Sequence, residues 1–146
     1  MKTCTFFGQR FVSKRVEKDV RTVIVQMIEK DRVELFLVGK EGGFNKMVQR
    51  LLGELEEIYP HIRYGVVFAY RRKKDKSAHS KNVIFPKDLG DVPRKYAVAY
   101  RNRWLIQRSD CAVVYVKKKF GELSRVEEVA QVQGLKIINV AIQTNA

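Results

Sequence analysis

The feature that most constrains the fold of this chain is an alternation of short apolar runs with longer segments of helical periodicity. Nearly continuous apolar runs occupy residues 2–8, 34–39, 63–70, 111–116 and 136–142. Apolar runs of this length, without a strict apolar–polar alternation, are typical of strands buried on both faces of a parallel sheet. The pattern therefore predicts five strands covered by helices on both faces.

The helical segments carry apolar residues on one stripe. Four helices are predicted, at 16–30, 44–59, 94–108 and 124–133. Pro60 ends the second, and Ser124 with Glu127 three residues later forms a capping box at the start of the last. Right-handed crossovers between such elements favour a doubly wound sheet. The sequence thus predicts one α/β domain over residues 1–146, a Rossmann-like three-layer sandwich with a mostly parallel sheet.

The charge balance points to an anionic partner. Lys and Arg number 29 against 16 Asp and Glu, which gives a formal net charge of +13 and a pI near 9.9. Such an excess attracts polyanions and anionic ligands, although a solvated basic surface has the same composition. No segment approaches the roughly 20 apolar residues of a membrane span, and the N-terminus lacks the apolar core of a signal peptide. We therefore expect a cytoplasmic protein without a membrane partner.

Cys4 and Cys111 both lie inside predicted strands. They have neither the CxxC spacing nor the neighbouring histidines of a metal site, and neither has an adjacent base for nucleophilic chemistry. We interpret both as buried, reduced thiols, and we expect no metal and no cofactor.

The second loop of the predicted sheet is the best candidate for an anion site. Ligands of such sheets bind beyond the carboxyl ends of the strands. Gly42 and Gly43 stand there, directly before a helix, where glycine allows close backbone approach and the helix N-terminus offers free N–H groups. The simpler interpretation is a tight turn with Asn45 as the helix N-cap. The spacing matches neither a dinucleotide fingerprint nor a P-loop.

The third predicted helix carries arginines within an apolar stripe. Arg94, Arg101 and Arg108 are seven residues apart and share one helix face. A buried arginine needs a partner, because an unpaired buried charge is costly. For Arg101 this partner is a ligand phosphate or a carboxylate such as Asp110 or Glu127. Arg94 and Arg108 stand at the helix ends and are expected on the surface.

Two basic runs favour a different function. Both leave the carboxyl ends of predicted strands, and Tyr70, Tyr100 and Phe120 are close to them in the sequence. The first run opens a long interruption of the alternation, which is usually functional or mobile. Basic residues interleaved with aromatic ones are typical of single-stranded nucleic-acid binding, and also of solvated loops. The residues of this alternative interface are Arg71, Arg72, Lys73, Lys74, Lys117, Lys118 and Lys119.

Several segments resemble small bacterial proteins of the SLOG superfamily, which is named for the DNA-processing protein A and lonely-guy groups. The most specific are TCTFFG at the start, YPHIRYGVVFAY, and RNRWLIQRSDCAVVYV, and the resemblance covers nearly the whole chain. It implies a Rossmann-like fold with a five-stranded sheet of order 3-2-1-4-5 and a nucleotide or nucleotide-derived ligand. Some members hydrolyse such ligands, and DNA-processing protein A binds single-stranded DNA.

The chain departs from this family in the three loops expected at the ligand site. Gln9 stands where the family has His, Asn45 where it has an acid, and Glu122 where it has the second glycine after strand four. The first two changes remove potential acid–base groups, so we favour binding over catalysis.

The sequence therefore predicts a nucleotide-like small molecule bound at the carboxyl edge of the sheet. The expected contacts are Gly8, Gln9, Arg10, Gly42, Gly43, Asn45, Arg101, Gly121 and Ser124. The second-loop residues would hold a phosphate through backbone N–H groups, and Arg101 would neutralise it. Two alternatives stay open: single-stranded nucleic-acid binding, and hydrolysis of an N-glycosidic or phosphoester bond with Glu127 or Glu122 as the acid–base group. The sequence leaves the oligomeric state open, and a homo-oligomer is compatible with each of these functions.

Overall fold

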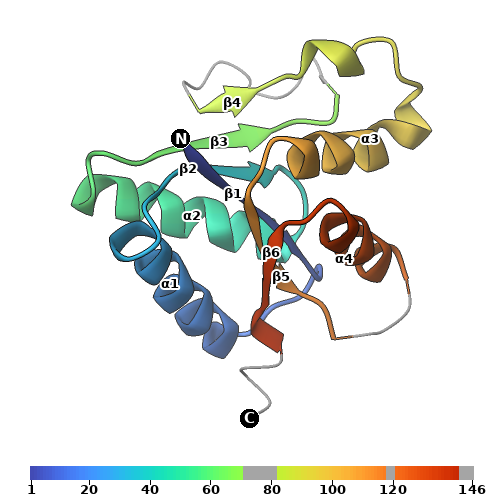
Figure 1. The fold of residues 1–146 in the computed structure, drawn as a ribbon. Coiled ribbons are helices and arrows are strands. Elements are labelled where there is room, and N and C mark those ends of the chain that lie inside the picture. Colours follow the sequence, from blue (N-terminus) through green and yellow to red (C-terminus); the bar gives the residue numbers. More distant parts are fainter. Residues whose placement is uncertain (71–81, 118–120, 142–146) are drawn as a thin grey trace.

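A computed structural model describes residues 1–70, 82–117 and 121–141 (Figure 1). The strands are β1 (Lys2–Gly8), β2 (Val33–Gly39), β3 (Arg63–Val67), β4 (Val83–Ile84), β5 (Cys111–Tyr115) and β6 (Lys136–Asn139). The helices are α1 (Lys14–Glu29), α2 (Gly43–Ile58), the 3-10 helix η2 (Lys87–Leu89), α3 (Arg94–Gln107) and α4 (Glu122–Val132). The predicted alternation of strands and helices is confirmed, although β3 and β6 end three residues earlier than expected.

The strands form one sheet in the order β4-β3-β2-β1-β5-β6, and every strand pair is parallel. The order implied by the family resemblance is present within it, because β3-β2-β1-β5-β6 has the same connectivity. The prediction of five strands was wrong by one. Val83 and Ile84 lie in the interruption of the alternation and were not predicted as a strand, but they pair with Val66 and Val67. Two residues are too few to give a periodic signal in a sequence.

Helices α1 and α2 cover one face of this sheet, and α3 and α4 cover the other (Figure 1). Side chains alternate between the faces along each strand, so Phe6 packs into the core under α1 and α2 and Phe7 into the core under α3 and α4. The helices contribute the stripes that their periodicity predicts, with Val20 and Leu52 fully buried. The architecture is a Rossmann-like three-layer α/β sandwich.

Two predicted helix starts were wrong. The last helix begins at Glu122 with Gly121 as its N-cap, so Ser124 lies inside the first turn and no capping box forms. Helix α2 begins at Gly43 with Gly42 as its N-cap, and Asn45 lies in its first turn. In both cases the helix begins one or two residues earlier than the apolar stripe indicates, directly after a glycine of positive φ.

The two cysteines lie directly opposite each other on β1 and β5. Both are free and buried, which confirms their interpretation as structural thiols. Burial raises the pKa of the Cys4 thiol, so this group stays protonated near neutral pH and is a poor nucleophile.

Candidate functional site

A cavity of about 380 Å³, here called the central cavity, lies beyond the carboxyl ends of β1 and β2, between α3 and α4. Its volume falls within the range of small-molecule sites. Five of the residues predicted from the sequence line it: Gly8, Arg10, Gly42, Asn45 and Arg101. These residues come from two strand-to-helix loops and one helix, so the fold brings together segments that are far apart in the sequence.

Two glycines set the backbone at the helix starts near this cavity. Gly42 has φ 91° and ψ 156°, and Gly121 has φ 116° and ψ −178°. This extended region at positive φ is essentially restricted to glycine, and it often occurs at functional sites. Each glycine is the N-cap of a helix, Gly42 of α2 and Gly121 of α4. The first turns of α2 and α4 therefore begin at the carboxyl edge of the sheet.

The loops after β1 and β2 are tied to each other at the start of α2. The backbone N–H of Gly43 donates a hydrogen bond to the carbonyl oxygen of Arg10 at 2.9 Å. The amide that was predicted to hold a phosphate is therefore occupied in this structure. Arg10 is one of the residues that line the central cavity, and it is exposed, with its guanidinium 6.0 Å from the Phe11 ring. It is therefore a solvent-accessible cation beside the cavity.

Arg101 is 3% exposed, although it carries a charge. Its Nη1 donates to Glu41 Oε2 at 2.8 Å and to the carbonyl oxygen of Val67 at 3.2 Å, and its Nε donates to Asn102 Oδ1 at 3.1 Å. Of the two kinds of partner considered for Arg101, the structure contains a carboxylate, but it is that of Glu41 and not of Asp110 or Glu127. The pair offsets the cost of burying the guanidinium.

The carboxylate of Glu41 and the amide of Asn45 complete this corner of the cavity. The Glu41 side chain is 42% exposed, and its Oε1 has no hydrogen-bond partner among the described residues. Asn45 Nδ2 donates to the carbonyl oxygen of Glu41 at 2.7 Å, whereas its buried Oδ1 has no partner in the described part of the chain. A Cβ added to Gly39 would lie 2.9 Å from Arg101 Cζ and 3.0 Å from Asn45 Nδ2, so both side chains converge on the end of β2.

The other predicted contacts lie outside the lining of the central cavity. Gln9 links two loops instead: its N–H donates to the Tyr115 carbonyl at 3.2 Å, and its Oε1 accepts from Lys117 N at 3.1 Å. Gly121 caps α4, and Ser124 is buried within it.

Only two of the residues predicted for the two alternative functions, Glu127 and Lys117, have side chains that the structure describes. Glu127 faces Asn139, whose Nδ2 lies 3.5 Å from Glu127 Oε2, and it does not line the central cavity. Lys117 is exposed. The remaining members lie outside the described residues: Arg71, Arg72, Lys73, Lys74, Lys118, Lys119 and the side chain of Glu122.

Six residues of the central cavity were not predicted from the sequence: Phe7, Glu41, Val98, Asn102, Leu123 and Val126. Two of these residues could have been found from the sequence. Val98 stands one helical turn before Arg101 on the same face of α3, and Glu41 lies within the loop already singled out for its glycines. Nothing in the sequence pattern relates Glu41 to Arg101, which is 60 residues away.

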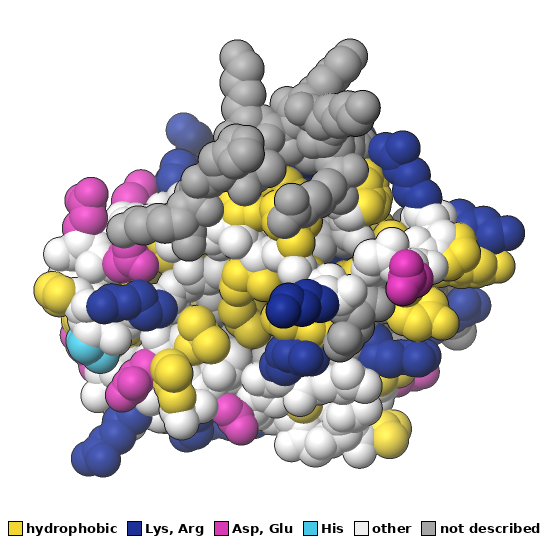
Figure 2. Space-filling model, turned by 90° about the horizontal axis from the view of Figure 1, so that it is seen from above, with side chains coloured by type: hydrophobic (Ala, Val, Ile, Leu, Met, Phe, Trp, Pro, Cys, Tyr) yellow, Lys and Arg dark blue, Asp and Glu magenta, His cyan; other side chains and the backbone are white. Residues whose placement is uncertain are grey.

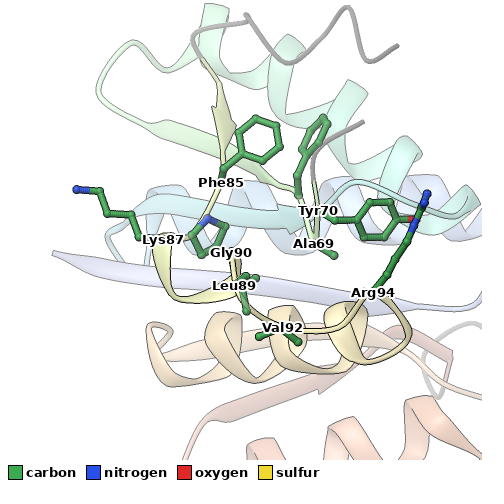
Figure 3. A pocket seen from close by; sticks show the side chains of 10 residues that line it. Ala69, Tyr70, Phe85, Lys87, Leu89, Gly90, Val92 and Arg94 are labelled. Carbon is green, nitrogen blue, oxygen red and sulfur yellow. The ribbon is translucent and has the colours of Figure 1, made fainter. Parts of the chain in front are cut away.

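A larger cavity of about 530 Å³, here called the edge cavity, lies at the β3–β4 edge of the sheet beside the start of α3 (Figure 3). The Phe68 and Phe85 ring centroids are 4.9 Å apart, and the Arg94 guanidinium lies over the Tyr70 ring at 4.5 Å. Lys87 lies at the opposite end from Arg94 (Figure 3). The edge cavity therefore combines aromatic walls with cations at its ends.

The exposed face of α3 continues this aromatic and basic character. Tyr96 is 49% exposed and Tyr100 is 47% exposed. The Lys95 ammonium lies 5.0 Å from the Tyr96 ring, and the Arg103 guanidinium lies 5.7 Å from the Tyr100 ring. Figure 2 shows Lys and Arg side chains distributed over the surface seen there, with hydrophobic side chains exposed between them. The helix is thus aromatic on its solvent side as well as apolar on its sheet side.

Fold and cavities define the class: a parallel, Rossmann-like α/β protein with a polar cavity at the carboxyl edge of its sheet. Neither the protein-family models nor the curated proteins contain a match to the chain. Within residues 1–70, 82–117 and 121–141, no group of three or more His, Cys, Asp and Glu side chains is arranged to hold a metal ion. No helix in these ranges is long and apolar enough to cross a membrane.

Proposed function

We propose that the protein binds a nucleotide or a nucleotide-derived molecule in the central cavity. The observation that carries this proposal is the position of the cavity, beyond the carboxyl ends of β1 and β2 and beside the start of α2. Open parallel α/β sheets bind their ligands at this edge, next to the point where strand order reverses, and β1 with β5 forms that point here. The cavity volume of about 380 Å³ falls within the range of small-molecule sites.

The charged residues that line the cavity favour an anionic ligand. Arg10 and Arg101 contribute two cations and Glu41 one anion, so the lining has a net charge of +1. The Arg101 charge is already compensated by Glu41, which leaves Arg10 as the cation for a phosphate. The partial positive charge at the N-terminus of α2 acts in the same direction.

The resemblance to the SLOG superfamily supports the same ligand class. Its segments include β1, β3 and β5 and the helix that carries Arg101. The ligands of that superfamily are thought to be nucleotides or molecules derived from them. The proposal assigns this chain to the binding members of the group, since the His and acid of the family pattern are replaced by Gln9 and Asn45.

A thermal-shift screen tests the proposal. The panel contains nucleoside mono-, di- and cyclic phosphates, NAD, ADP-ribose and a short oligo-dT, each at low and high salt. A ligand at 100 times its Kd stabilises the folded state by about 2.7 kcal/mol, which gives a clear shift. We expect a shift that survives high salt with at least one small nucleotide. No shift with any of them would contradict the proposal.

A cavity-filling variant assigns the shift to the central cavity. Val98→Phe places a ring in the lining, whereas Val132→Phe makes the same change at a position that is 88% exposed on α4. We expect the nucleotide shift to disappear in the first variant and to remain in the second. A shift that persists in Val98→Phe would place the ligand elsewhere.

A second candidate function, single-stranded nucleic-acid binding, is favoured by the edge cavity and the exposed aromatic face of α3. Such proteins bind bases by stacking them on aromatic side chains beside cations, and each stacked base contributes about 1–3 kcal/mol to the binding free energy. We expect the double change Tyr96→Ala and Tyr100→Ala to weaken oligo-dT binding at least tenfold, and Ile58→Ala, 57% exposed on α2, to leave it unchanged. Affinity that does not fall with rising salt would exclude this function, because phosphate contacts release counterions.

A further inference from the structure

We infer that the corner of the central cavity formed by Glu41, Arg101 and Asn45 recognises the 2′,3′-diol of a ribose, so that the protein prefers ribonucleotides to 2′-deoxyribonucleotides. The inference rests on the proposed function and extends it to the sugar of the ligand. It is based on the hydrogen-bonding atoms in this corner that have no partner among the described residues.

The Glu41–Arg101 pair presents one acceptor and one donor side by side. Glu41 Oε2 and Arg101 Nη1 are engaged with each other at 2.8 Å. Glu41 Oε1 and Arg101 Nη2 have no hydrogen-bond partner among the described residues, and both side chains line the central cavity. A paired carboxylate and guanidinium therefore offer the cavity a free oxygen acceptor and a free N–H donor.

Asn45 adds a second acceptor next to this pair. Its Oδ1 is buried without a partner within the described ranges, which is unfavourable for a polar atom. Its Nδ2 is fixed on the carbonyl oxygen of Glu41 at 2.7 Å, so the amide cannot simply be reversed. Because Oδ1 is buried, a ligand donor reaches it only if the Asn45 side chain turns toward the cavity, which the broad terminal torsion of asparagine allows.

A vicinal diol matches this arrangement, whereas a phosphate does not. A hydroxyl both donates and accepts, so one hydroxyl can donate to Glu41 while its neighbour accepts from Arg101. A phosphate only accepts and is repelled by the carboxylate. A base edge such as that of adenine also combines a donor with an acceptor, so the comparison of adenosine with inosine monophosphate distinguishes it from the diol. In a nucleotide the sugar also adjoins the phosphate, and Glu41 precedes the start of α2, to which the Arg10 loop is tied through Gly43.

Calorimetric titration of the unmodified protein is the primary test. The probes are the 5′-mono- and diphosphates of the four ribonucleosides, their 2′-deoxy counterparts, and inosine monophosphate for comparison with adenosine monophosphate. We expect the ribo form to bind about tenfold more tightly than the 2′-deoxy form, because the missing hydroxyl leaves a cavity group unpaired.

Two variants and one control connect this preference to the residues. Glu41→Gln keeps an oxygen for Arg101 Nη1 and is expected to fold, but it replaces the free acceptor by a donor. We expect the ratio of deoxy to ribo Kd to fall to about twofold in Glu41→Gln and in Asn45→Ala. Glu57→Gln changes an exposed glutamate of α2 outside the cavity lining, and it should keep the tenfold ratio.

The outcomes distinguish a failure of the diol inference from a failure of the proposed function. A ribose preference that is lost in Glu41→Gln and kept in Glu57→Gln supports both. Measurable binding with equal affinity for ribo and deoxy forms overturns the diol inference and leaves the proposed function intact. A preference for adenosine over inosine without a ribose preference overturns it as well, in favour of the base. Failure of every nucleotide to bind overturns the inference together with the proposed function.

Discussion

The two faces of the sheet are packed differently. Among the described residues, twenty-three buried side chains form the core under α1 and α2, whereas eight form the core under α3 and α4. The central cavity lies on the second face, where α3 and α4 meet the strand ends, and the edge cavity lies beside the start of α3. The helices differ accordingly: α2 buries a continuous apolar stripe, and α3 buries an arginine.

This difference indicates that one face of the sheet mainly stabilises the fold, whereas the other face accommodates the cavities. A dense core of α1, α2 and the central strands supplies most of the apolar burial that stabilises the fold. The opposite face then tolerates polar side chains such as Arg101 and Asn102 beside a cavity, at a cost in stability that the first face offsets. Four predictions, ordered from the largest expected effect on stability to the smallest, test this contrast.

The largest effect is expected for a truncation in the dense core. Leu52→Ala removes a fully buried side chain of α2 and should lower the free energy of unfolding by about 3 kcal/mol, or about 10 °C in Tm. The matched change Leu123→Ala, at a half-buried residue beside the central cavity, should cost about 1 kcal/mol. Chemical denaturation of both variants measures the difference. Equal costs would contradict the contrast between the faces.

Removal of the buried arginine should have the next largest effect. Arg101→Ala deprives the Val67 carbonyl and Asn102 of their donor and separates the ion pair, but Glu41 is exposed enough to be hydrated. We expect a loss of about 2 kcal/mol, less than for a fully buried pair. Urea denaturation measures it. A change below about 0.5 kcal/mol would mean that the pair is not formed in solution.

A smaller effect is expected for the N-cap glycine of α2. Gly42 has φ 91° with open space around it, so Gly42→Ala introduces backbone strain without a steric clash and should cost about 1–2 kcal/mol. Gly90→Ala is the control, because Gly90 has φ −60°. Its stability should change by less than about 0.5 kcal/mol. Thermal unfolding compares the two, and equal shifts would show that the positive φ is not required.

The smallest effect on stability, but not on binding, is expected for Arg10→Ala. Arg10 is exposed, so its truncation should change the free energy of unfolding by less than about 0.5 kcal/mol. Nucleotide affinity should fall about tenfold through the loss of a charge-assisted hydrogen bond. Arg15→Ala, an exposed arginine of α1, should leave both quantities unchanged. If nucleotide affinity stays within twofold of the wild type, Arg10 does not contact the phosphate.

Much of the fold, but only part of the site, was predictable from the sequence. The apolar runs located five of the strands, and the stripes located four helices, because burial imposes a period on residues that are neighbours in the chain. The strand Val83–Ile84 was too short to show a period. The glycines and Arg10 were found because a strand-to-helix loop has a recognisable composition, whereas Phe7 and Leu123 look like any other core residue.

The sequence by itself determined the layers, the buried thiols and the burial of one helical arginine. Only the tertiary structure decided that this arginine pairs with Glu41, that the Gly43 amide is already bonded to Arg10, and that Gln9 links the loops after β1 and β5. The physical reason is that helical and strand periodicities are local, while hydrogen bonds at the sheet edge join loops whose proximity depends on strand order. That order places β1 between β2 and β5, and the central cavity forms at the end of these strands.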